Sequence, residues 1–158
     1  MRKNLFVSAL VVTFVMLTSA SMAAAADNWI GSWKLNVAKS KYMPGPGPKS
    51  QTLKFEATPA GIKLSTEAVG ADGTTNKGGY TAKFDGTDAP WVGNADADTA
   101  APKRIDDNSY ENVWKKGGKV TVTAKAAVSA DGKTLTISQT GKNAKGDTVN
   151  NVGVYDKQ

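Results

Sequence analysis

Apolar and polar residues alternate with a period of two along most of the sequence after residue 28, and turn residues interrupt the alternation roughly every ten residues. In the first such stretch, Trp33, Leu35 and Val37 share one face. Lys34 and Asn36 lie on the opposite face. This pattern is typical of an antiparallel sheet with one buried face and one solvated face. No stretch beyond residue 26 shows comparable helical periodicity, so the sequence predicts an all-β fold.

The turn signals divide this alternation into short strands. Asp-Gly and Gly-Gly pairs favour tight hairpins, because both central residues tolerate positive φ; they occur at 72–73, 85–86, 117–118 and 131–132. Residues 94–102 are small and polar, and predict a loop. Strands are expected at 29–37, 51–58, 62–69, 78–84, 91–92, 103–105, 109–116, 119–129, 133–140 and 149–155.

This spacing of strands is typical of a barrel or a sandwich. Consecutive short hairpins favour up-and-down order, and a closed barrel has no free edge strands. We therefore predict an antiparallel up-and-down β-barrel of about 8–10 strands.

The first 26 residues have the features of a secretory signal peptide. Arg2 and Lys3 form a basic start, and the apolar stretch 5–17 is too short to cross a bilayer as a helix. Ala24-Ala25-Ala26 fits a small-residue cleavage site before Asp27. We expect residues 1–26 to be a signal peptide and 27–158 to be one barrel domain. The protein is then periplasmic or secreted, with no membrane anchor after cleavage.

The composition disfavours several function classes. The chain has no Cys and no His, which removes thiolate metal sites, Cys nucleophiles and the commonest general base. The formal net charge is +6, but the basic residues are scattered beside turns, so no nucleic-acid partner is expected. Asn94, Asp96 and Asp98 resemble the start of a calcium loop, yet Thr99 and Ile105 stand where Gly and an acidic residue are needed. We expect no enzyme activity, no metal and no cofactor.

Both ends of the predicted domain carry distinctive motifs. Gly31-Ser32-Trp33-Lys34-Leu35 is similar to the Gly-x-Trp opening of the calycin superfamily, the lipocalins and fatty-acid-binding proteins. The run 152–157, Val-Gly-Val-Tyr-Asp-Lys, is similar to their closing strand, and Lys39-Ser40-Lys41-Tyr42 resembles a run in small secreted bacterial lipocalin-like proteins. The resemblance implies a lipocalin-like barrel with a cavity open at one end.

The resemblance also implies roles for particular residues. In that superfamily the Trp at the position of Trp33 closes one end of the barrel, often under a basic side chain from a late strand. Arg104 and Lys157 are the two candidates for that cation. Fatty-acid-binding proteins carry an Arg two residues before the closing Tyr, whereas Gly153 precedes Tyr155 here. A carboxylate clamp is therefore not expected.

The segment 41–49 contains three prolines alternating with glycines, and it predicts an extended connection across one end of the barrel. It is either a rigid linker or an entrance rim, in which Tyr42 and Met43 contact a ligand. It stands where fatty-acid-binding proteins have a helix-turn-helix lid.

Aromatic side chains are the candidate ligand-binding residues. In a small barrel, inward rings either fill the core or line a pocket, and the sequence leaves both alternatives open. The candidates are Tyr42, Phe55, Tyr80, Trp91, Tyr110, Trp114 and Tyr155. Small inward residues such as Ala68 and Ala124 fit a hollow barrel or a tightly closed one.

Two functions follow from these alternatives. The first is a periplasmic or secreted lipocalin-like protein that binds a small, partly apolar or aromatic ligand. The second is a structural or protein-interaction module of the envelope, with a filled barrel and no ligand. The sequence does not determine the oligomeric state.

Overall fold

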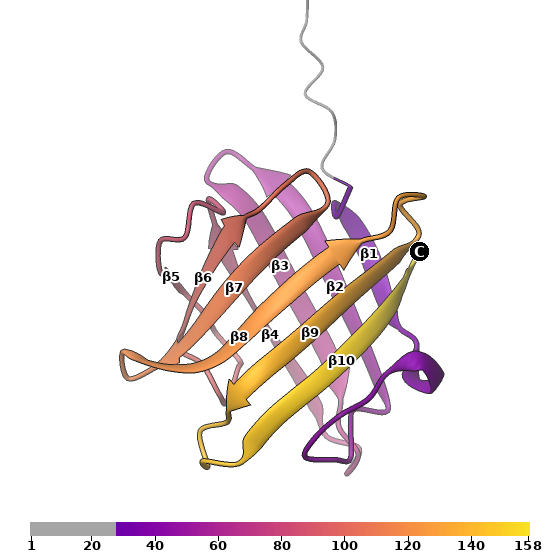
Figure 1. Cartoon of the computed structure of the whole chain (residues 1–158), viewed down its shortest axis with the longest axis vertical. Coiled ribbons are helices and arrows are strands. Elements are labelled where there is room, and N and C mark those ends of the chain that lie inside the picture. The colour runs from indigo at the N-terminus through magenta and orange to yellow at the C-terminus, as the bar shows by residue number, and fades with distance from the viewer. Residues whose placement is uncertain (1–27) are drawn as a thin grey trace, which may run out of the picture.

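The computed structural model describes residues 28–158, which form ten β-strands and one short 3₁₀-helix (Figure 1). The predicted signal peptide at 1–26 lies outside the described residues. Within 28–158, no helix is long and apolar enough to span a membrane. The elements are β1 (Gly31–Leu35), η1 (Val37–Lys39), β2 (Ser50–Thr58), β3 (Gly61–Val69), β4 (Thr75–Ala82), β5 (Ala89–Pro90), β6 (Thr99–Arg104), β7 (Ser109–Lys116), β8 (Lys119–Val128), β9 (Thr134–Lys142) and β10 (Thr148–Lys157).

All ten strands belong to one antiparallel sheet, in the order β4-β3-β2-β1-β10-β9-β8-β7-β6-β5. Strands that follow one another in the sequence pair with each other, except β4 and β5, which form the two edges of the sheet. In addition, the first strand, β1, pairs with the last strand, β10. Strands β6–β10 therefore cross in front of β2–β4 in Figure 1. The predicted all-β, up-and-down barrel is confirmed, with ten strands.

The two sheet edges meet through a close backbone contact after β5. The Gly79 N–H donates to the Val92 carbonyl at 2.9 Å, and the Val92 N–H donates back to Gly79 at 3.1 Å. A Cβ atom on Gly78 would lie only 2.3 Å from the Val92 carbonyl oxygen, so a side chain at this position would force the edges apart. This contact nearly closes the barrel.

One end of the barrel is filled by aromatic rings, and we call it the closed end. Trp33 and Trp29 are fully buried there, and the Trp33 indole N–H donates to the Trp29 carbonyl at 2.7 Å. The Lys157 Nζ lies 5.0 Å from the centre of the Trp33 ring, whereas the Arg104 guanidinium lies 4.8 Å from the Trp29 ring. Of the two candidate cations, Lys157 is therefore the one over Trp33.

Tyr110 connects this aromatic cluster to the middle of the barrel. Its ring lies 5.0 Å from Trp29 and 4.9 Å from Phe84, both in edge-to-face geometry, and 6.3 Å from Phe55. Such pairs add about 0.5–1.5 kcal/mol beyond the burial of their area. Aromatic packing therefore stabilises the closed end.

The predicted boundaries are wrong at several strands, among them β4, β5 and β6. β6 begins at Thr99, inside the predicted loop 94–102, and its Ala100 and Pro102 are buried. Pro102 has no N–H to donate, but its carbonyl still accepts a hydrogen bond from the Gly86 N–H at 2.9 Å, so a Pro is tolerated there. β4 ends at Ala82 rather than at 84, and β5 covers 89–90, before the predicted 91–92.

Two valines that strand alternation places on the inner face lie outside. Val37 is 51% exposed because the chain leaves β1 after Leu35 and forms η1, with Asn36 as the N-cap. Val120 is 61% exposed because β8 contains a bulge: Trp114 pairs with Val122, while the next residue of β7 pairs with Val120. Because β8 has one extra residue at the bulge, the side chains that precede Val122 point to the opposite face from the one that simple alternation predicts.

Candidate functional site

A cavity of about 330 Å³ occupies the half of the barrel opposite the closed end. It reaches the mouth of the barrel, which we define by the segment 42–48, the loop 91–98 and the turns at 117–118 and 143–147 (bottom of Figure 1). Inward side chains of β2, β3, β4, β7, β8, β9 and β10 form its walls. The barrel is hollow at this end, which answers the question that the sequence left open.

All seven predicted site residues lie on the wall of this one cavity. They are Tyr42, Phe55, Tyr80, Trp91, Tyr110, Trp114 and Tyr155. Period-two alternation brings together the five that lie on strands, because residues of one parity on each strand face the interior. Tyr42 and Trp91 lie in connecting segments at the mouth. Met43, the other predicted contact, is 57% exposed and points away. That these aromatic residues bind a ligand stays a prediction.

Three of these rings form a continuous aromatic wall beside the junction of the sheet edges. The Tyr80 and Trp91 rings lie 5.0 Å apart at 71°, and the Trp91 and Trp114 rings lie 4.9 Å apart at 79°. Tyr80 comes from β4, Trp91 follows β5 and Trp114 comes from β7. The edge-to-face packing fixes the ring faces that a ligand would meet.

A buried amide lies against this aromatic wall. Asn112 is 3% exposed, and its Nδ2–H donates to the Tyr80 hydroxyl at 3.2 Å. Its Oδ1 is buried and accepts no hydrogen bond from any described residue. The Trp114 indole N–H is also buried, and it donates to no described residue. A buried polar atom without a partner costs about 1–3 kcal/mol, so these two groups are unsatisfied within the described residues.

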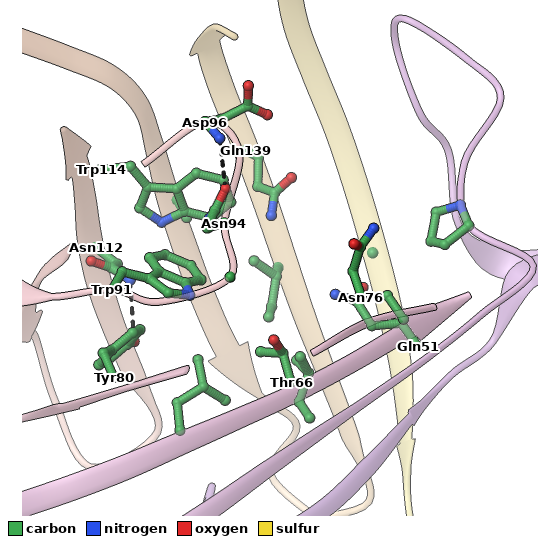
Figure 2. Close-up of a pocket in the computed structure, with 18 of the residues that line it drawn as sticks. Gln51, Thr66, Asn76, Tyr80, Trp91, Asn94, Asp96, Asn112, Trp114 and Gln139 are labelled. Carbon is green, nitrogen blue, oxygen red and sulfur yellow. Dashed lines mark hydrogen bonds between the residues drawn. The ribbon is translucent and has the colours of Figure 1, made fainter. Parts of the chain in front are cut away.

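Further polar side chains lie across the cavity from Asn112. Figure 2 shows Asn112, Trp91 and Tyr80 on one side of the cavity and Gln51 and Asn76 on the other. The Tyr155 hydroxyl donates to Gln51 Oε1 at 2.8 Å. Burial raises the pKa of Tyr155 and of Tyr80, so both hydroxyls stay protonated at neutral pH.

Sequence reasoning missed these polar lining residues, although the signal was present. Gln51 has the parity of Leu53 on β2, Asn76 that of Tyr80 on β4, and Gln139 that of Ile137 on β9. A polar residue at an inward position is the sequence signature of a lined pocket.

The loop 91–98 crosses the mouth and is held by its own acidic residues. Asp96 Oδ1 accepts from the Ala144 N–H at 2.9 Å, and Asp98 Oδ2 accepts from the Gly117 N–H at 2.9 Å. Asn94 Oδ1 accepts from the Asp96 N–H at 2.9 Å. The two aspartate oxygens thus accept from backbone amides of the neighbouring turns, and the Asn94 oxygen accepts from an amide of its own loop. Residues 28–158 hold no group of three metal-ligating side chains.

The cavity wall carries almost no charge. Among the described lining residues, Asp96 is the one charged side chain, and no Lys or Arg is present. A Cβ atom at Gly153 would lie 2.8 Å from Tyr155 Cε2, so the Tyr155 ring occupies the space that a side chain at 153 would need. The structure therefore provides no cation to pair with a carboxylate inside the barrel.

Comparison with known proteins identifies no family for this chain. No protein-family model matches the sequence, and no curated protein matches it. Among solved structures, the chain is similar to the zebrafish ileal bile acid-binding protein, crystallised with cholic acid. The identity is 8% and the TM-score is 0.46, over 83% of this chain and 99% of that one. A likeness at this level says nothing about which ligand this chain binds.

Proposed function

We propose that this protein binds a small, uncharged, partly apolar molecule inside its barrel and performs no catalysis. The observation that carries the proposal is the cavity of about 330 Å³ bounded by the seven aromatic residues. Binding sites for small molecules are concave, mostly apolar and contain a few placed polar groups. The aromatic wall and the Asn112–Tyr80 pair fit that description.

The size of the cavity limits the ligand. A volume of about 330 Å³ suits a small molecule. It lies near the lower limit of ordinary ligand pockets, about 300–1,000 Å³.

The charge of the wall favours a neutral ligand. An ionised carboxylate that leaves water needs a partner, and no Lys or Arg among the described residues lines the cavity. Asp96 adds a negative charge at the mouth, although the Ala144 amide bonds it. Uncharged alcohols, phenols, ketones and amides avoid this cost.

The other expected function, a structural or protein-interaction module, presupposed a filled barrel. The structure has a cavity instead, so that premise is wrong. A role in binding another protein stays a prediction. A periplasmic or secreted location also stays a proposal, which is supported by the sequence of residues 1–26 alone.

A cavity-filling substitution tests the proposal. Ala124 is 3% exposed and faces the cavity, and Ala127 lies on the same strand with its side chain on the exposed outer face. We expect methoxynaphthalene, substituted at the β position, to bind the wild-type protein in calorimetric titration. Ala124→Phe abolishes this binding because the new ring occupies the ligand's space, whereas Ala127→Phe leaves it unchanged. Equal binding by both variants would place the ligand outside the barrel and refute the proposal.

A further inference from the structure

The aromatic wall of the cavity contains an unusual set of unmatched hydrogen-bonding groups. Asn112 is the one polar residue among the fully buried residues of 28–158, and its Oδ1 accepts no hydrogen bond. The Trp114 indole N–H donates to nothing among the described residues. The Tyr80 hydroxyl accepts from Asn112, and its own hydrogen has no acceptor there. The wall thus offers one buried acceptor and two donors.

These groups lie within one cluster. Asn112 and Trp114 are two residues apart on β7 and face the same side of the strand. Trp91 lies 4.9 Å from the Trp114 ring and 5.0 Å from the Tyr80 ring, so it bridges the two donors. Figure 2 shows Tyr80, Asn112, Trp91 and Trp114 together on one side of the cavity.

We infer that this cluster selects ligands that carry a neutral group able both to donate and to accept a hydrogen bond, attached to a flat ring. A hydroxyl or a lactam has that capacity: its hydrogen bonds Asn112 Oδ1, and its oxygen accepts from Tyr80 or Trp114. This inference rests on the proposed binding function and deepens it. It names Asn112 as the residue that determines specificity.

Other functional groups fit the cluster less well. An ether or ketone can accept from Tyr80 or Trp114 but leaves Asn112 Oδ1 without a donor. A carboxylate has no hydrogen to donate, and its charge would approach the carboxamide oxygen with no cation nearby. A site with buried hydrogen-bonding groups discriminates strongly against analogues that leave those groups unpaired.

Three matched probes separate these cases: naphthol, methoxynaphthalene and naphthoate, all substituted at the β position. We expect the wild-type protein to bind naphthol about tenfold or more tightly than either of the others in calorimetric titration. Asn112→Leu keeps the size of the side chain and removes the carboxamide. In this variant we expect the affinities for naphthol and methoxynaphthalene to differ by no more than about twofold, because only the affinity for naphthol falls.

Two further variants serve as a control and as a substitute for Asn112→Leu. Asn150→Leu is the same substitution at an exposed position of β10, and it leaves the preference unchanged. If Asn112→Leu fails to fold by circular dichroism, Tyr80→Phe serves instead, because it removes the hydroxyl and keeps the ring. We expect it to reduce the preference for naphthol several-fold.

The outcomes distinguish this inference from the proposed function. Equal affinity of the wild-type protein for naphthol and methoxynaphthalene overturns the inference while the binding function stands. A preference that survives both Asn112→Leu and Tyr80→Phe overturns it as well, as does naphthoate binding as tightly as naphthol. Failure of both neutral probes to bind refutes the proposed function itself.

Discussion

Removal of the Trp33 ring tests the division of the barrel into a filled end and a hollow end. Trp33 is 0% exposed, donates to the Trp29 carbonyl at 2.7 Å and lies under Lys157. A fully buried Trp→Ala change costs about 3–5 kcal/mol, a large part of the roughly 5–15 kcal/mol that stabilises a typical domain. Trp91→Ala, on the half-buried cavity wall, should cost less than half as much, because one side of that ring faces empty space.

Urea denaturation followed by circular dichroism at pH 7 measures these free energies of unfolding. Trp33→Phe separates the contribution of the hydrogen bond from that of ring packing, because it keeps an aromatic ring and loses the hydrogen bond to Trp29. It should cost about 1 kcal/mol or somewhat more. Lys157→Met should cost about 0.5–1 kcal/mol through loss of the cation–π contact. Equal losses for Trp33→Ala and Trp91→Ala would refute the division into two ends.

Two further predictions concern the closure of the sheet and the buried hydroxyls. Gly78→Ala should destabilise the protein by about 1–3 kcal/mol and speed hydrogen exchange at the Gly79 amide, because the new Cβ would lie 2.3 Å from the Val92 carbonyl oxygen. The control Thr81→Ala, on the exposed face of β4, should change the free energy of unfolding by no more than about 0.5 kcal/mol. Equal effects of the two substitutions would contradict the closure of the barrel at this contact. Burial raises the pKa of all four tyrosines in the folded state above the ordinary value of about 10, so their contribution to stability is complete below pH ~10 and is lost as the pH rises further. For the deeply buried Tyr80, Tyr110 and Tyr155, phenolate absorbance should therefore appear together with loss of the circular dichroism signal, and their ionisation in a protein that stays folded would contradict this.

Local sequence patterns predicted most of the architecture because turn chemistry and alternation act within a few residues. The turn at Gly117-Gly118 forms where expected, with both residues at positive φ. The first part of β6 was assigned to a loop because Ala100, Ala101 and Pro102 lack the β-branched and aromatic side chains typical of strands. That strand exists because β5, β7 and the residues around Phe84 supply its hydrogen bonds, which is long-range information.

The cavity depended on features that the sequence does not show directly. Alternation identified the inward aromatic residues but not whether their rings meet in the centre. At the closed end, Trp29, Phe84 and Tyr110 fill the space, whereas near the mouth small residues such as Ala124 and Gly153 leave it empty. The bulge before Val122 also places Val120 on the outer face, and no local pattern marks it.

The four indole N–H groups report directly on the central claim that ligands bind in the hollow half of the barrel. All four Trp residues of the chain lie in the described part, with Trp91 and Trp114 on the cavity wall and Trp29 and Trp33 at the closed end. Their indole resonances in a nitrogen–proton correlation spectrum, assigned by single Trp→Phe variants, can be followed while β-naphthol is added. We predict that the Trp91 and Trp114 resonances shift to saturation while those of Trp29 and Trp33 stay in place. Saturable shifts confined to Trp29 and Trp33, or no shift at any indole, would contradict the account.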